Sequence, residues 1–338
     1  MSKLGVCVIG CGQIGSQRAK VARESKGSSL KMVVDLNLDK ARTLARKMNC
    51  SWGTRWEKAI SDSSVNTVIV STPHHFLSKI SCAALHAGKN VLVEKPMGLN
   101  WDEAQKIVQS ANKSKGKLKV GFNHRYHPAI FKAHQIYSQG TIGPILNIRS
   151  RYGHGGRIGY EKEWRSDPYQ SGGGELIDQG SHVIDLIQWF CGQPSHVFSF
   201  LQTGFWKIGP LEDNAFGLLK YKNGIIAQFH TSWTQWKNLF NFEVLGTRGM
   251  ISVEGLGGNY GPETLTVSLI RKPGQVPKSK QEVFNDLDRS WNREWDDFVQ
   301  GIRLGDPYWG SLQDGISVMR ILKGLYESNR AGKIVPIK

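Results

Sequence analysis

Hydrophobic residues fall in short runs along the first third of the sequence, and a stretch with helical periodicity follows each of the first four. Continuous apolar runs of this length are typical of parallel strands that are covered on both faces of a sheet. The runs predict strands at 4–9, 30–35, 66–71, 90–94 and 118–122. The stretches between them predict four helices. The first ends near residue 23, and the others cover about 38–48, 75–87 and 100–114. This alternation indicates an α/β fold with a doubly wound parallel sheet.

The pattern changes after residue 123. A helix near 128–139 precedes alternating segments that predict strands at 145–152, 196–206, 214–221, 225–232, 240–245 and 250–254. Residues 222–224 and 247–249 have the composition of hairpin turns. We therefore predict two domains: a Rossmann domain over 1–123, and an α+β domain over 124–338 with a largely antiparallel open sheet and helices on one face. The pattern leaves open which domain the last two helices, near 288–303 and 312–331, pack on.

A glycine-rich turn joins the first strand to the first helix, with the sequence Gly10-Cys-Gly12-Gln13-Ile14-Gly15. In this context the first glycine permits a tight turn, the second lets a pyrophosphate approach the backbone, and the third lets the helix pack on the strand. The helix N-terminus then lies at the phosphate. We expect these residues to bind a dinucleotide.

The second strand ends at Asp35, twenty residues after Gly15. A carboxylate at this position accepts hydrogen bonds from the adenosine ribose and repels a 2′-phosphate, which favours NAD over NADP. Ligands of such sheets bind beyond the carboxyl ends of the strands. The further residues predicted at that edge are Ser71, Thr72, Pro73, Glu94, Lys95 and Asn123.

The segment from Ser171 to Phe190 combines three consecutive glycines with a helical pattern. Its apolar residues lie on one side of the predicted helix, whereas Asp178, His182 and Asp185 share the opposite stripe. Residues four apart are neighbours on a helix, so Asp178 can orient the His182 imidazole for proton transfer. The alternative is an ordinary solvated polar face. Gly180 inside the helix predicts that another element packs closely against it.

The composition is that of a globular protein of 338 residues, with a net charge of +16 and a pI near 9.6. Five scattered cysteines without a CxxC pair indicate neither disulfides nor a metal site, which favours a reduced, cytoplasmic protein. We see no signal peptide or membrane-spanning run. The charge leaves three interpretations open: a phosphorylated small molecule as ligand, a merely basic surface, or nucleic acid, which ranks last because no nucleic-acid motif accompanies it.

Taken together, the motifs resemble those of the Gfo/Idh/MocA oxidoreductases. The similarity rests on the glycine turn, on Ser71-Thr72-Pro73, on the run from Ala87 to Glu94-Lys95-Pro96, on Gly121-Phe-Asn-His-Arg125 and on the run from Gly172 to Asp185. It extends from about residue 3 to 330. The resemblance implies NAD(P)-dependent redox chemistry at a hydroxyl of a carbohydrate or cyclitol, and a homo-oligomer, a dimer or tetramer, formed through the open sheet.

The resemblance also implies roles for individual residues. Lys95, Asp178 and His182 match the family's catalytic group, with Lys95 between nicotinamide and substrate. The substrate residues that it implies are Lys95, Tyr152, Arg157, Trp164, Arg165, Asp178 and His182. The sequence departs from the family pattern at Leu77, where relatives often have a histidine that His74 or His75 would have to replace. It departs again at His124 and His127, where relatives often have arginine and aspartate.

The expected activity is therefore the oxidation or reduction of a secondary sugar hydroxyl with NAD, with His182 as the acid-base group. Similarity to nucleotide-sugar dehydrogenases at 153–156 and 160–165, together with the basic charge, favours a nucleotide sugar or sugar phosphate as substrate. Two alternatives stay open: a redox-neutral glycosidase or epimerase that uses NAD transiently, and a non-catalytic NAD-dependent sensor. The sugar, its reacting carbon and the physiological direction are not determined by the sequence.

Overall fold

A computed structural model describes residues 3–270, 272–285 and 287–338. The chain forms two compact units. Unit 1 contains Met1–Asn123, Tyr169–Gly172 and Trp291–Met319, and unit 2 contains His124–Pro168, Gly173–Ser290 and Arg320–Lys338. Within the described ranges, no helix is long and apolar enough to cross a membrane.

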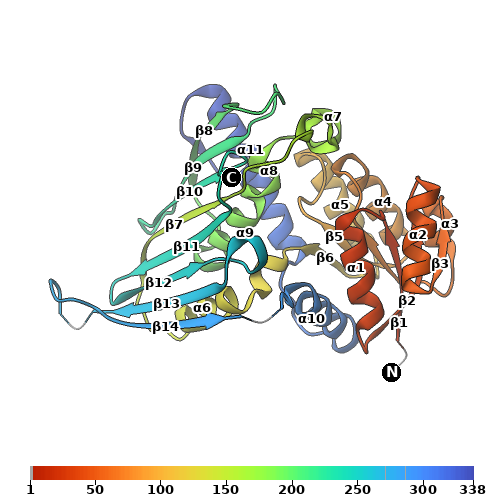
Figure 1. Ribbon diagram of the computed structural model, residues 1–338, viewed down its shortest axis with the longest axis horizontal. Coiled ribbons are helices and arrows are strands. Elements are labelled where there is room, and N and C mark those ends of the chain that lie inside the picture. Colours follow the sequence, from red (N-terminus) through yellow and green to blue (C-terminus); the bar gives the residue numbers. More distant parts are fainter. Residues whose placement is uncertain (1–2, 271, 286) are drawn as a thin grey trace. The chain divides into compact units, whose positions relative to one another are not determined.

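Unit 1 is built on a six-stranded parallel sheet with the order β3-β2-β1-β4-β5-β6 (Figure 1). Its strands are β1 (Leu4–Ile9), β2 (Ser28–Val34), β3 (Ser51–Gly53), β4 (Thr67–Val70), β5 (Asn90–Glu94) and β6 (Leu118–Gly121). Its helices are α1 (Gln13–Glu24), α2 (Leu38–Met48), α3 (Trp56–Ser61), α4 (His74–His86), α5 (Trp101–Lys113) and most of α10 (Ser290–Leu304). The five predicted strands are present. The sequence pattern missed β3 and α3 because both are short and partly exposed.

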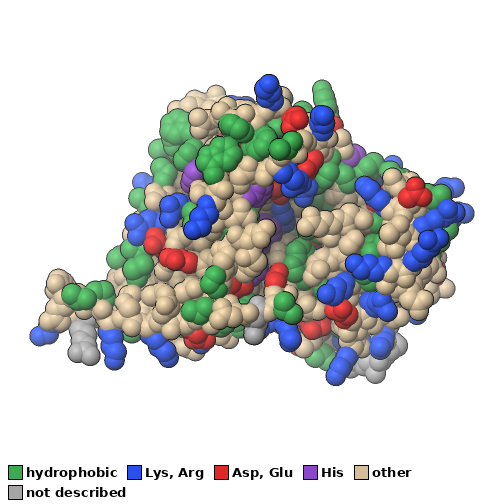
Figure 2. Space-filling view, in the orientation of Figure 1, with side chains coloured by type: hydrophobic (Ala, Val, Ile, Leu, Met, Phe, Trp, Pro, Cys, Tyr) green, Lys and Arg blue, Asp and Glu red, His purple; other side chains and the backbone are tan. Residues whose placement is uncertain are grey.

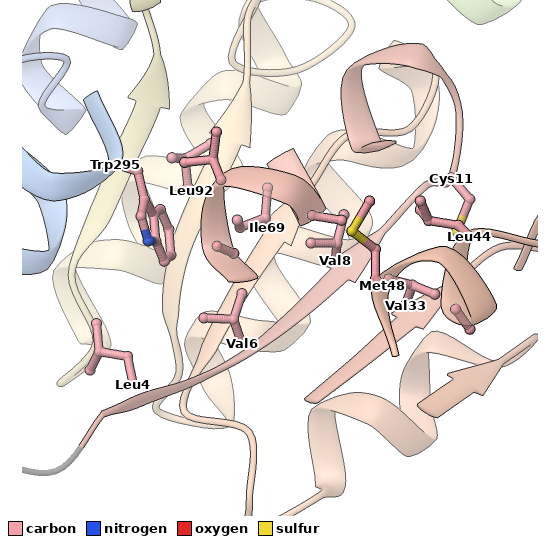
Figure 3. Close-up of a cluster of buried hydrophobic side chains, with 14 of the residues drawn as sticks. Leu4, Val6, Val8, Cys11, Val33, Leu44, Met48, Ile69, Leu92 and Trp295 are labelled. Carbon is pink, nitrogen blue, oxygen red and sulfur yellow. The ribbon is translucent and has the colours of Figure 1, made fainter. Parts of the chain in front are cut away.

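A single apolar core joins the sheet of unit 1 to helix α10 (Figure 3). Val6 and Val8 of β1 are fully buried, and Trp295 of α10 is 1% exposed in the same cluster. The indole Nε1 of Trp295 donates a hydrogen bond to Ser28 Oγ at 2.9 Å, so the one polar atom of this large side chain is satisfied. Helix α10 is therefore an integral part of unit 1, although it is far from β1 in the sequence.

Unit 2 contains a nine-stranded sheet with the order β14-β13-β12-β11-β7-β10-β9-β8-β15. The strands are β7 (Ile145–Gly153), β8 (His196–Gln202), β9 (Asn214–Lys220), β10 (Ile226–Ser232), β11 (Leu239–Gly246), β12 (Gly249–Glu254), β13 (Glu263–Leu269), β14 (Lys278–Phe284) and β15 (Val335–Pro336). Adjacent strands are antiparallel except β7 and β10, which are parallel. The predicted, largely antiparallel sheet is confirmed. The hairpin β13–β14 was missed because β14 is polar and mostly exposed.

Helices α6 (Pro128–Ser138), α8 (Glu175–Asp178) and α9 (Gly180–Cys191) pack on the sheet of unit 2 (Figure 1). Helix α6 contacts β12 to β14, α8 contacts β9 and β10, and α9 contacts β7 and β10. The remaining elements are the 3-10 turns η1 (Asn123–Tyr126), η2 (Tyr160–Lys162), η3 (Trp164–Ser166) and η4 (Gly258–Tyr260), and helices α7 (Pro168–Ser171) and α11 (Leu312–Ala331).

The prediction of a single helix through Asp178 and His182 is wrong, because the helix is interrupted at Gln179, which separates α8 from α9. The alternative of an ordinary solvated polar face is also wrong, because His182 is 7% exposed and Asp185 is fully buried. A Cβ on Gly180 would lie 3.1 Å from Leu176 Cδ1 and 3.5 Å from Thr231 Oγ1, which confirms the predicted close packing at this glycine.

The interior of unit 1 also contains a buried cluster of charges centred on Arg18 of α1. Its Nε lies 2.6 Å from Glu94 Oε1 at the end of β5, and its Nη1 donates to Glu294 of α10. Arg18 and Glu294 are 1% and 0% exposed. A buried cation with two carboxylates fixes the angle at which three elements meet, and loss of the cation leaves uncompensated charge.

We predict that Arg18→Met lowers the free energy of unfolding by about 3–5 kcal/mol, because two carboxylates then lose the buried cation that they share. Burial already raises the pKa of Glu294, and Arg18 opposes that rise. In the variant the folded state binds the proton more tightly than the unfolded state does, so the deficit should shrink as the pH falls from 8 to 5. Urea titrations at several pH values measure this change. The exposed Arg23→Met on the same helix is the control, and equal losses in both variants would contradict the assignment.

Candidate functional site

The glycine turn of unit 1 has the geometry that a dinucleotide needs. Gly10 has a φ of +99°, and a Cβ there would lie 2.4 Å from the carbonyl oxygen of Ser71. A Cβ on Gly15 would lie 1.8 Å from the carbonyl oxygen of Gly10, so α1 packs directly on the turn. By contrast, a Cβ on Gly12 would meet no atom of the described residues within 4 Å. The backbone at Gly12 is thus open to a ligand at the N-terminus of α1, beside Gln13 and Ile14.

Asp35 is held at this turn by two backbone amides. The N–H of Cys11 donates to Oδ2 at 2.7 Å, and the N–H of Asn37 donates to Oδ1 at 2.8 Å. The side chain is partly exposed, and each carboxylate oxygen keeps a further acceptor position. Asp35 therefore stands beside the glycine turn with capacity to accept hydrogen bonds from two vicinal hydroxyls.

The next strand brings Ser71, Thr72 and Pro73 to the same edge of the sheet. Ser71 Oγ donates to the carbonyl oxygens of Ile9 and Gly10, at 3.2 and 3.1 Å, which ties β4 to the glycine turn. All three residues are partly exposed. The neighbouring His74 is buried, and its Nδ1 lies 2.7 Å from the carbonyl oxygen of Ser171, which belongs to the same unit.

Three further residues predicted for the cofactor follow β5 and β6. The Glu94 carboxylate is occupied by Arg18 inside unit 1, so its predicted cofactor contact stays a prediction. Lys95 follows it and is partly exposed, and Asn123 is 4% exposed at the start of η1. Leu77, the departure from the family pattern on α4, is fully buried in the apolar interior.

In unit 2, the segment Gly173-Gly174 approaches other backbone and side chains too closely for any larger residue. A Cβ on Gly173 would lie 2.1 Å from Tyr326 Oη, and one on Gly174 would lie 2.1 Å from the carbonyl oxygen of Glu212. The buried Glu212 carboxylate accepts hydrogen bonds from Gly174 N at 3.0 Å, Leu176 N at 3.1 Å and Tyr326 Oη at 2.7 Å. Burial raises the pKa of Glu212, and these donors oppose the rise.

Asp178 and His182 sit on either side of the break between α8 and α9. Asp178 is partly exposed, and its Oδ2 lies 3.4 Å from Arg165 Nε. The His182 ring is buried and stacks on the His124 ring, with centroids 3.8 Å apart. Asp185, one turn later, forms a bidentate ion pair with Arg125 at 2.8 and 2.6 Å. Asp185 is therefore a structural anchor for α9.

The predicted substrate residues of unit 2 are only partly brought together. Arg165 reaches Asp178 and packs over the Trp164 ring at 4.6 Å. Tyr152 is 8% exposed, and its hydroxyl lies 3.2 Å from His124 Nε2. Arg157, however, is exposed and forms a bidentate pair with Glu163, so its charge is already matched.

Several residues near Asp178 were missed by sequence reasoning. Gln179 Nε2 donates to Tyr260 Oη at 3.2 Å, and burial raises the pKa of Tyr260 to about 12. Burial lowers the pKa of His154, and the charge of Asp178 opposes that fall. Tyr260 lies in a separate 3-10 turn, η4, without a recognisable motif, so only the fold brings it to this place. Among the described residues, no group of three or more His, Cys, Asp or Glu is arranged to hold a metal ion.

Two domain models of one family match the chain. Residues 4–122 match an oxidoreductase family with an NAD-binding Rossmann fold, and residues 130–252 match the GFO/IDH/MocA C-terminal domain. The levoglucosan dehydrogenase of Pseudarthrobacter phenanthrenivorans is 26% identical over 65% of this chain and 64% of that protein. The 1,5-anhydro-D-fructose reductase of Ensifer adhaerens is 26% identical over 79% of this chain and 80% of that protein.

The fold is shared with solved structures over its whole length. A levoglucosan dehydrogenase in complex with NADH and levoglucosan is similar with a TM-score of 0.90 and 23% identity, covering 99% of this chain and all of that one. The open backbone at Gly12 and the oriented Asp35 carboxylate agree with the dinucleotide site that the first family model describes. The chain therefore belongs to the GFO/IDH/MocA oxidoreductases, with the NAD-binding Rossmann domain of that family followed by its C-terminal domain.

Proposed function

We propose that this protein oxidises or reduces a secondary hydroxyl of a sugar or a related cyclic polyol, with NAD as the hydride carrier. The observation that carries the proposal is the placement of Asp178 and His182 at the junction of α8 and α9, in a chain whose other unit has the dinucleotide turn. Named relatives that act on such compounds, the levoglucosan dehydrogenase and the 1,5-anhydro-D-fructose reductase, support the substrate class.

In this proposal His182 accepts the proton of the reacting hydroxyl. Imidazole is the side-chain group whose charge ordinarily changes between pH 5 and 8, which suits proton transfer at neutral pH. Asp178, four residues earlier, supplies negative charge that favours the protonated ring, and Arg165 holds the Asp178 carboxylate in place. The family resemblance assigns Lys95 the role of hydrogen-bond donor to the reacting oxygen. Gly10, Gly12, Gly15 and Asp35 are the residues that would hold NAD, which would supply the hydride acceptor for the carbinol carbon.

An anionic sugar remains within the proposal. Arg157 and Arg165 lie on the segment before α8, but each already has a carboxylate partner, Glu163 and Asp178. A phosphate would have to replace one of these carboxylates. Such an exchange suits arginine, because its planar guanidinium can form paired hydrogen bonds with a carboxylate or with a phosphate. Nucleotide sugars and sugar phosphates therefore belong in the substrate panel beside free sugars and inositols.

Substitution of the proposed catalytic residues should lower turnover, which is measured as NADH formation at 340 nm with a sugar that serves as substrate. His182→Asn should lower kcat by about 100-fold or more, because a general base contributes about 10²–10⁴-fold. Lys95→Ala should lower kcat similarly while calorimetry shows NAD binding within a few-fold of the wild type.

Lys106→Ala, an exposed lysine on α5, is the matched control. Unchanged turnover in Lys95→Ala would remove Lys95 from the mechanism. If no sugar produces NADH, deuterium exchange from solvent into a substrate carbon, dependent on NAD, would indicate the redox-neutral alternative. Absence of both, with NAD bound, would favour the sensor.

Asp35 is the residue expected to determine the choice between NAD and NADP. Asp35→Ala should weaken NAD binding by about 10–150-fold through loss of hydrogen bonds to a charged acceptor, and should improve NADP binding because the 2′-phosphate is no longer repelled. Calorimetric titration of both cofactors measures the change, with the exposed Asp102→Ala on α5 as control. Equal weakening for NAD and NADP would contradict the role assigned to Asp35.

A further inference from the structure

Unit 2 contains a second histidine in direct contact with His182. The His124 ring, on η1, stacks on the His182 ring of α9 with centroids 3.8 Å apart and planes 22° apart. Both side chains are buried, at 6% and 7% exposure. His124 is also one of the three positions, with Leu77 and His127, where the sequence departs from the family pattern. The stack is thus a property of this chain's own residues.

His124 also contacts polar and aromatic partners besides His182. Its Nε2 lies 3.2 Å from Tyr152 Oη, and burial raises the pKa of Tyr152 well above its usual value, so the phenol stays protonated. The His127 ring meets it edge-on at 5.4 Å, and His127 Nδ1 lies 2.6 Å from Glu263 Oε1. The Phe240 ring also meets the His124 ring edge-on, with centroids 6.3 Å apart. These partners fix the plane of the His124 ring, and the stack transmits that plane to His182.

Simple filling of space does not account for this arrangement. A phenyl ring would occupy the same volume without the desolvation of two ring nitrogens. Two parallel imidazolium rings 3.8 Å apart would repel each other strongly, since little water can enter between buried rings. Sites that interact this strongly titrate as a pair and not one by one.

The ionisable groups around the pair come from several elements. They are Asp178 and Asp185 on the segments of His182, Arg125 and His127 beside His124, Glu175 on α8, Tyr152 on β7, Tyr260 on η4, Glu263 on β13, and His154 and Arg165 after β7. Six of these groups form three pairs: Arg125 binds Asp185, His127 contacts Glu263 and Arg165 contacts Asp178. These pairs leave the repulsion between the two stacked rings in place.

We infer that His124 is a positioning residue for His182: it fixes the plane of that ring, and the two rings together carry no more than one proton at neutral and mildly acidic pH. The inference rests on the proposed role of His182 as acid-base group. In that role a neutral His124 leaves His182 free to accept the proton of the substrate, and the flat contact keeps Nδ1 and Nε2 in the plane in which the proton is exchanged.

The direct test is a titration of the histidine ring resonances by NMR between pH 4 and 9, in the NAD-free full chain. In the wild type the His124 and His182 signals should share two steps separated by about two pH units or more. In His124→Phe the His182 signal should titrate in one step. The exposed His196 serves as internal reference. Independent single steps for both rings, unchanged by the substitution, would overturn the shared proton.

The kinetic test separates ring position from proton sharing. His124→Phe keeps a flat ring and should hold kcat within about threefold of the wild type, whereas His124→Asn removes the stack and should lower kcat about tenfold with little change in KM. His134→Asn is the matched control, because the His134 ring of α6 also stacks on a ring of α9, that of Trp189, with centroids 3.7 Å apart. Thermal unfolding of each variant identifies a loss that comes from misfolding.

The outcomes are distinguishable from those of the proposed function. Coupled titration without turnover of any sugar would uphold the paired rings and reject the dehydrogenase. Turnover that depends on His182 but is equal in the wild type, His124→Phe and His124→Asn would uphold the dehydrogenase and reject the positioning role.

Discussion

The buried ion pair between Arg125 and Asp185 is the interaction on which the arrangement of the candidate acid-base site depends. Arg125 binds both carboxylate oxygens, at 2.8 and 2.6 Å, and the two side chains are 2% and 0% exposed. A bidentate pair fixes the orientation of both partners as well as their distance. Because His124 precedes Arg125 and His182 lies one turn before Asp185, fixing η1 against α9 also fixes the two imidazoles. The pair has value for geometry more than for stability, since burial of both charges is costly.

A second constraint is the close approach of the glycine segment to its neighbours in unit 2. Gly173 and Gly174 leave no room for a side chain, and the backbone amides of Gly174 and Leu176 donate to the Glu212 carboxylate. Tyr326 of α11 donates to the same carboxylate, so three distant parts of the sequence meet at one buried acceptor. Because buried N–H groups require partners, this cluster determines where α8 begins and therefore where Asp178 and His182 lie.

Three buried cations form ion pairs with carboxylates, whereas the excess positive charge lies on the surface. Arg18 pairs with Glu94 and Glu294, Lys119 with Asp297, and Arg125 with Asp185. On the face shown in Figure 2, lysine and arginine side chains are spread over the surface with acidic groups among them. The net charge of +16 is therefore carried by exposed groups, which act on solubility and on the approach of anions more than on the fold.

The sequence by itself determined the parallel sheet of unit 1, most strands of unit 2 and the dinucleotide turn. Apolar runs and a strand-turn-helix glycine pattern are local signals, and residues such as Gly10, Gly15 and Asp35 act through backbone that is close in the chain. Only the tertiary structure decided that Trp295 completes the core of unit 1, that Gln179 interrupts the predicted helix, and that Asp185 binds Arg125 instead of joining an acid-base row. The stack of His124 on His182 belongs to the same class. These contacts join residues far apart in sequence, and their partners follow from packing between elements, which periodicity along a single segment cannot encode.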